Sequence, residues 1–114
     1  MALEVYETGL ILTVIRWIEM SRKKHAWPEE ADGIPQAFGV LNEEIRELRK
    51  AVDRSHPDEH VVFELLDVIT VAIRMLCGEH LRGDKKQKWL DLVISAEPTQ
   101  PGEIGPYDEH KGEK

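Results

Sequence analysis

Acidic side chains at helical spacing are the feature of this sequence that is best suited to chemistry. Glu64 and Asp67 lie in residues 61–77, where every residue except these two, Thr70 and Arg74 is apolar. Steps of three and four residues place these four side chains on one stripe of a helix. Two carboxylates in such apolar surroundings would cost several kcal/mol each, on the order of the penalty for a buried ion, unless they are paired. They therefore require a cation.

A second acidic group precedes this segment. Glu43, Glu44 and Glu47 lie beside the apolar face of a predicted helix, where like charges destabilise the helix unless they are neutralised. One interpretation is a solvated surface, with Glu43 paired to Arg46 and Glu47 to Lys50.

The alternative interpretation joins the two acidic groups. The turn over residues 53–58 is short, so the two helices should be antiparallel neighbours. Glu44 and Glu47 would then lie opposite Glu64 and Asp67. Four carboxylates from two facing helices predict a site for a hard cation, either Mg²⁺ or Mn²⁺.

Two other uses of these carboxylates would be a di-iron site and a structural network of ion pairs. The chain contains no Glu-x-x-His pair, which disfavours a di-iron helical bundle. A structural network of ion pairs is the competing explanation. Its cations would be Arg46, Arg49 and Arg74.

Hydrophobic periodicity predicts an all-α fold. A first amphipathic helix covers residues 3 to about 24, and a second opens at Pro35. The apolar central helix is expected over about 58–80, and a last helix over roughly 85–96 with Asp84 as its cap. No strand pattern is present. The sequence predicts a bundle of about four helices.

Composition narrows the class of protein. The 114 residues suit one domain, expected over 1–96, followed by an extended tail rich in Pro, Gly and charge over 97–114. A net charge of −7 argues against binding a nucleic-acid polymer. Cys77 is the only cysteine, and no segment resembles a signal peptide or a membrane span. A cytoplasmic protein is expected.

The paired acidic motifs resemble those of the MazG-type all-α nucleoside triphosphate pyrophosphohydrolases. Glu-Glu-x-x-Glu at 43–47 is followed, after sixteen residues, by Glu-x-x-Asp at 64–67, and the similarity covers about residues 10–80. It implies a helical bundle that forms dimers or tetramers. It also implies Mg²⁺-dependent hydrolysis of a nucleoside triphosphate to the monophosphate and pyrophosphate. The stretch 83–89 does not clearly reproduce the Asn or Lys signature of many relatives, so the substrate stays open.

The resemblance assigns roles to the acidic residues. It implies that Glu44, Glu47, Glu64 and Asp67 hold the metal. Glu43 would be a further ligand, or would contact the ligands without binding the metal itself. These five residues are the predicted catalytic residues.

Phosphate and base would need other groups, because the chain has no glycine-rich phosphate loop. Arg74, on the same stripe as Asp67, is the first candidate for phosphate; weaker candidates are Lys85, Lys86 and Lys88. Trp27, with His25 near it, is the best placed group to stack on a base, although Trp27 could equally close the end of the bundle. Trp17 and Trp89 are expected in the core or an interface. His56, His60 and His80 are expected at the surface.

The apolar central helix also predicts self-association, because so small a chain has few helices to cover it. We therefore expect a homodimer or homotetramer. Two further functions stay open. One is phosphoribosyl-ATP pyrophosphohydrolase, whose acidic motifs are similar, and the other is a non-catalytic helical interaction module.

Overall fold

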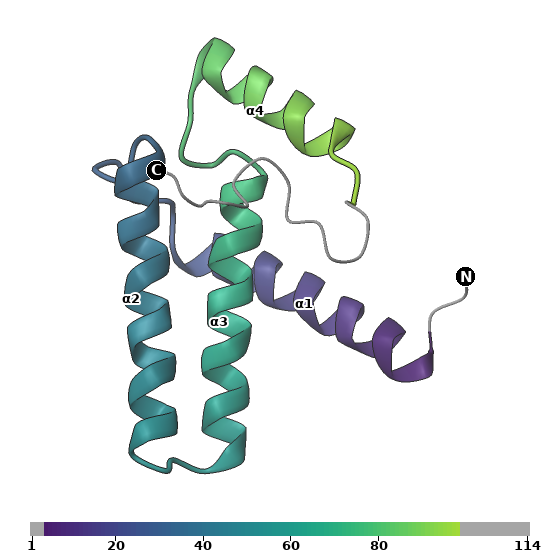
Figure 1. Ribbon diagram of the computed structural model, residues 1–114, viewed down its shortest axis with the longest axis vertical. Helices are drawn as coiled ribbons and strands as arrows, with labels where there is room; N and C mark the ends of the chain where they lie inside the picture. The colour runs from purple at the N-terminus through teal and green to yellow at the C-terminus, as the bar shows by residue number, and fades with distance from the viewer. Residues whose placement is uncertain (1–3, 99–114) are drawn as a thin grey trace, which may run out of the picture.

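The structure is a computed structural model that describes residues 4–98, and these residues form four helices without any strand (Figure 1). The predicted all-α fold with four helices is confirmed. The helices are α1 (Val5–Lys24), α2 (Ile34–Asp53), α3 (Asp58–Leu76) and α4 (Gly83–Ser95). Residues 99–114 of the predicted tail lie outside the described residues.

Helices α2 and α3 form an antiparallel hairpin (Figure 1). Pro35 lies in the first turn of α2, as predicted, where its missing N–H costs no hydrogen bond. The turn spans residues 54–57, and the His56 N–H donates to the carbonyl of Ala51 at 2.9 Å. Ser55 adopts a left-handed φ of 53° there. So short a turn fixes which faces of the two helices meet.

Helix α3 is the centre of the fold, because it packs against each of the other three helices. In Figure 1, α1 crosses behind α3, and α4 lies over the end of the hairpin where α3 finishes. Trp17 of α1 packs against Phe63 of α3, with ring centroids 5.7 Å apart. The apolar segment singled out in the sequence therefore occupies the central position.

The end of α3 differs from the prediction, which extended this helix to His80. The helix ends at Leu76 because Gly78 takes a left-handed φ of 78°. The N–H of Gly78 donates to Met75 O, and that of Glu79 donates to Arg74 O, the pattern of a Schellman motif. Gly78 is the feature of the sequence that indicates the end of this helix.

The start of α4 also differs. Arg82 occupies the N-cap position and makes no capping hydrogen bond through its side chain. Asp84, predicted as the cap, lies inside the first turn. There its charge still favours the positive end of the helix dipole.

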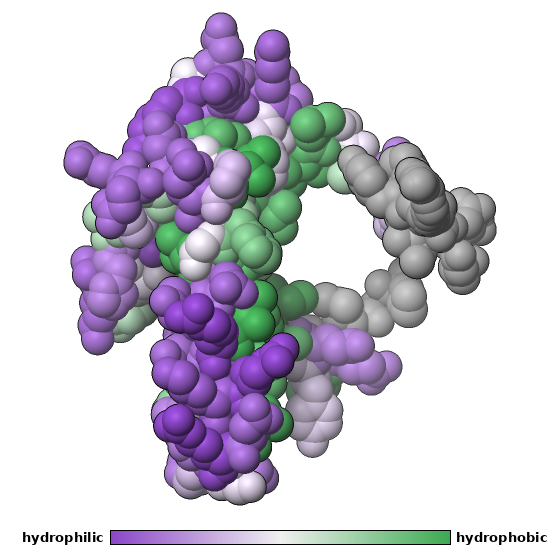
Figure 2. Space-filling view, turned by 60° about the vertical axis from the view of Figure 1, so that its left-hand side comes forward, coloured by the Kyte–Doolittle hydropathy of each residue, from purple (hydrophilic) through white to green (hydrophobic). Residues whose placement is uncertain are grey.

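The core of a single chain is thin. Its buried apolar residues in the described part are Ala31, Ala37, Ala51, Leu66 and Leu81. Large apolar side chains stay exposed instead, and they are densest on α1 and α3. Figure 2 shows hydrophobic residues reaching the surface between hydrophilic ones. Within residues 4–98, no helix combines the length and apolar composition needed to cross a bilayer.

Candidate functional site

Three of the four predicted ligands come together between α2 and α3. Glu44 projects from α2, and Glu64 and Asp67 project from α3, where they are one turn apart. One carboxylate oxygen from each residue lies within 4.8 Å of the others. We call these three residues the carboxylate group. All three are partly buried, as expected for side chains between two packed helices.

The surroundings disfavour negative charge on this group. Burial raises the pKa of Glu44, and the neighbouring charges of Asp67 and Glu64 raise it further. The pKa of Asp67 is also raised, by burial first and then by Glu64, while His25 acts in the opposite direction. A bound cation would relieve both the burial penalty and the mutual repulsion.

The competing ion-pair network does not form around the carboxylate group. In the described part of the chain, no Arg or Lys lies within ion-pair distance of Glu44 or Asp67. Arg74 pairs with Glu79, at 2.7 Å between Nε and a carboxylate oxygen. Glu64 has one basic neighbour, His60, whose Nε2 lies 3.3 Å from its Oε2.

Glu43 and Glu47 lie outside the carboxylate group, on the exposed side of α2. Glu43 pairs with Arg46 at 3.1 Å and Glu47 with Lys50 at 3.5 Å, each three residues further along the helix. These are the surface pairs of the solvated interpretation. Glu47, predicted as a fourth ligand, is therefore held by a cation of its own helix.

The carboxylate group fits a divalent hard cation. Its donors are carboxylate oxygens, which Mg²⁺ and Mn²⁺ prefer, and it includes three acidic side chains without a Lys or Arg partner. Three protein ligands would leave further coordination positions for water or a substrate oxygen. Among residues 4–98, this is the one group of acidic, His or Cys side chains with metal-binding spacing.

The carboxylate group opens onto a cavity of about 580 Å³. Four segments build the cavity walls: the second half of α1, residues 25–28, α2 and α3. Glu44 and Asp67 are wall residues. Thr70, one turn beyond Asp67, is another, and its buried hydroxyl has no hydrogen-bond partner in the structure. A ligand in the cavity could supply that partner.

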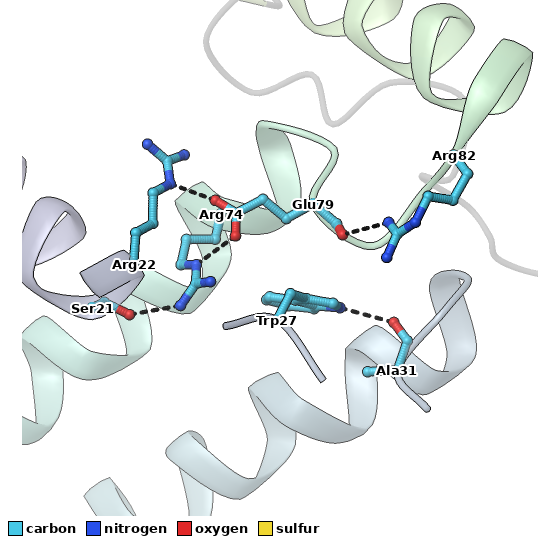
Figure 3. Close-up of polar contacts among 7 residues, drawn as sticks. All are labelled: Ser21, Arg22, Trp27, Ala31, Arg74, Glu79 and Arg82. Carbon is cyan, nitrogen blue, oxygen red and sulfur yellow. Dashed lines mark hydrogen bonds and ion pairs between the residues drawn. The ribbon is translucent and has the colours of Figure 1, made fainter. Parts of the chain in front are cut away.

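All three predicted substrate-binding residues line this cavity: His25, Trp27 and Arg74. Arg74 is nearly fully buried, at 5% exposure, and its guanidinium is already engaged. Nε donates to Glu79 at 2.7 Å and Nη1 to the Ser21 hydroxyl at 2.8 Å (Figure 3). Glu79 also accepts from Arg22 at 2.6 Å, so it ties the end of α3 to α1.

Trp27 is fixed in the cavity wall by two contacts. Its indole Nε1 donates to Ala31 O at 2.9 Å, and the Arg74 guanidinium carbon lies 5.6 Å from its ring centroid (Figure 3). The second distance is in the range of a cation–π interaction. Trp27 thus packs against the end of α3 and is a wall residue of the cavity, while its stacking on a base stays a prediction.

The structure corrects one prediction about the histidines. His80, expected at the surface, is fully buried in the loop between α3 and α4. Its ring contacts Trp89 edge to face at a centroid distance of 4.8 Å, and neither ring nitrogen has a hydrogen-bond partner. Burial lowers the pKa of His80, partly opposed by the charge of Asp32.

Further cavity residues were missed by sequence reasoning. Trp17 was expected only in the core or an interface, and it forms part of the wall. Arg16 and Lys24, also from α1, are wall residues too. No local pattern marks them, because the crossing of α1 over α3 decides which face of α1 meets the cavity.

Comparison with known proteins adds no identification. No family model, no curated protein and no solved structure matches this chain. The functional argument therefore depends on the residues and their geometry.

Proposed function

We propose that this protein is a Mg²⁺-dependent nucleotide pyrophosphohydrolase, which converts a nucleoside triphosphate to the monophosphate and pyrophosphate. One observation carries the proposal: Glu44 and Asp67 belong both to the carboxylate group and to the wall of a cavity with basic and aromatic sides. A nucleoside triphosphate needs a hard cation for its phosphates and aromatic surface for its base. The cavity volume is in the range of small-molecule sites.

Different residues have different roles in the proposed reaction. Glu44, Glu64 and Asp67 would hold the ion; when bound, Mg²⁺ supplies positive charge to phosphate oxygens and lowers the pKa of a bound water. No protein nucleophile is required. Water attacks the α-phosphorus and gives up a proton to solvent, the bond from that phosphorus to the bridging oxygen breaks, and pyrophosphate departs with this oxygen. Trp17 and Trp27 offer the aromatic surface for the base.

A pyrophosphate-release screen tests the function. Canonical, deoxy and modified nucleoside triphosphates would be assayed with Mg²⁺, beside phosphoribosyl-ATP. We expect pyrophosphate and the monophosphate from at least one nucleoside triphosphate, and loss of activity in EDTA. Release from phosphoribosyl-ATP alone would establish the second enzymatic alternative. No release from any substrate with Mg²⁺ or Mn²⁺ would refute the enzyme and favour an interaction module.

The proposal includes a homodimer or homotetramer. The exposed apolar residues on the central helix support it: Val62, Phe63, Leu65, Ile69 and Leu76. α1 carries an even more exposed set, including Tyr6 at 90% exposure. A second copy presents the same apolar faces, so a two-fold contact would cover both at once.

The oligomer is tested by light scattering after size exclusion. Leu65→Glu should produce a monomer, because it places a charge on the proposed interface. Ile94→Glu is the matched control: Ile94 is 82% exposed but belongs to α4, and not to α1 or α3. A monomeric unmodified protein, or equal effects of the two variants, would contradict the proposed interface.

A further inference from the structure

The cations around the cavity fall into two kinds. Arg74 is committed to Glu79 and Ser21, so its guanidinium is largely used within the protein. Arg16 and Lys24 also line the cavity, but neither has a carboxylate within ion-pair distance in the described part of the chain. Both residues are exposed to solvent. Their charges are therefore available to a ligand.

These two cations occupy one face of α1. The α1 residues in the wall recur at positions 16, 17, 20, 21 and 24, the spacing of a single helical face. Arg16 and Lys24 stand two turns apart, roughly 12 Å along the axis at 1.5 Å per residue. Glu44 and Asp67 enter the same cavity from α2 and α3. The cavity thus combines an acidic side with a basic side.

Charge balance requires such a basic side. The chain carries −7 overall, and the carboxylate group would repel any phosphate brought near it. One divalent ion offsets only part of the charge of three ionised carboxylates, so a polyphosphate chain would still meet excess negative charge. Arg16 and Lys24 lie in the cavity wall without a carboxylate partner among the described residues, so they would supply the missing attraction.

We propose that Arg16 and Lys24 form a polyphosphate-binding subsite, which holds the phosphate chain of the substrate. Arg74, the candidate chosen from the sequence, instead fixes Trp27 in the cavity wall. The role of the subsite in hydrolysis depends on the proposed pyrophosphohydrolase function. Binding of the phosphate chain does not, because it requires no reaction.

Inorganic tripolyphosphate with Mg²⁺ is the probe, since it carries no base or sugar. Binding would be measured by isothermal titration calorimetry to the full chain. Arg16→Ala and Lys24→Ala should each weaken binding by at least about tenfold, the loss of one charge-assisted contact. Arg16→Lys, which keeps the charge, should recover part of the affinity.

Two variants control for overall charge. Lys23→Ala removes the same charge beside Lys24, and Arg49→Ala removes an exposed guanidinium of α2; neither residue lines the cavity. Both controls should bind tripolyphosphate within about twofold of the unmodified protein, because they lie outside the cavity wall and change only the overall charge. Equal losses in the controls, or unchanged binding in Arg16→Ala and Lys24→Ala, would overturn the subsite.

The outcomes separate the two proposals. If the unmodified protein binds tripolyphosphate, Arg16→Ala and Lys24→Ala weaken it, and no nucleotide is hydrolysed, the subsite stands and the pyrophosphohydrolase falls. If nucleotides are hydrolysed and the two variants bind normally, the function stands and the subsite falls. Absence of tripolyphosphate binding to the unmodified protein also overturns the subsite.

Discussion

Glutamate side chains on the two sides of α2 differ in whether a cation of the protein neutralises them. On the outer side, Glu43 and Glu47 each pair with a cation three residues along their own helix. On the inner side, Glu44 faces two further carboxylates and no Arg or Lys within ion-pair distance, as far as the described residues show. Glu43 and Glu44 are sequence neighbours. The facing helix, and not the residue type, decides whether a carboxylate is neutralised locally or left for a ligand.

The largest expected effect comes from replacing Asp67 of the carboxylate group. Replacement of Glu47, on the outer side of α2, is the comparison. Asp67→Asn should reduce turnover and Mn²⁺ affinity by at least about 10- to 100-fold, the cost of losing a group that supports a metal ligand, because it removes a ligand charge while keeping the side-chain shape. Glu47→Gln should change both by less than about threefold, since its carboxylate is exposed and paired with Lys50. Pyrophosphate release and calorimetric titration with Mn²⁺ provide the measurements.

Equal losses in these two variants would break the comparison. They would mean that Glu47 leaves Lys50 and joins the carboxylate group when the metal binds. Circular dichroism of both variants is the control, and each should keep the helical content of the unmodified protein.

A second effect concerns stability against pH without metal. The folded-state pKa of Glu44 and of Asp67 is raised above the usual values of 4.5 and 3.8. Their contribution to stability is therefore present below these values and is lost as pH rises through the folded-state pKa. In EDTA, the Asp67→Asn variant should be more stable than the unmodified protein at pH 7. Urea unfolding at a series of pH values measures this.

Added metal should reverse that order. Mg²⁺ at 100 times its dissociation constant would stabilise the unmodified protein by about 2.7 kcal/mol, and Asp67→Asn much less. Unfolding curves that are the same with Mg²⁺ and with EDTA would argue against an ion at the carboxylate group.

Buried His80 should make the stability depend on pH with the opposite sign. Burial lowers the folded-state pKa of His80 from its usual 6.5, so the unfolded chain binds protons first as pH falls. Stability is retained above about pH 6.5 and is lost on acidification. In His80→Gln this loss should shrink, as measured by urea unfolding between pH 5 and 7.5. An unchanged pH profile would show that His80 ionises freely in the folded protein.

The smallest effect is expected on the outer side of α2. Arg46→Ala and Lys50→Ala should each change the free energy of unfolding by about 0 to 1 kcal/mol, because their ion pairs are exposed. The change should vanish in about 1 M salt, where screening is strong. Thermal unfolding at low and high salt measures it, and a loss of several kcal/mol would show that these pairs are structural.

Sequence reasoning predicted the carboxylate group because its cause is local. A short turn forces α2 and α3 to run antiparallel, and one-turn spacing aligns Glu64 with Asp67. Glu44 and Glu47 could not be separated in this way. They lie about 60° apart around the helix, so a modest rotation of α2 decides which of them faces α3.

The parts that were missed depend on distant contacts. His80 lies in the loop between α3 and α4 and packs against Trp89 of α4 and near Trp27, so its immediate sequence does not predict its burial. The basic side of the cavity depends on how α1 crosses α3. By contrast, the end of α3 could have been predicted, since Gly78 is the residue best suited to a left-handed helix stop.

Two of the three indoles in this chain, Trp17 and Trp27, stand in the cavity wall, whereas Trp89 donates its Nε1 hydrogen to Leu76 O and is not a wall residue. Tryptophan fluorescence is therefore an intrinsic probe of the cavity. Occupancy of the cavity should register in intrinsic fluorescence, and a Trp89→Phe background would isolate that emission. Candidate ligands can thus be surveyed without labels, whether or not the protein turns them over.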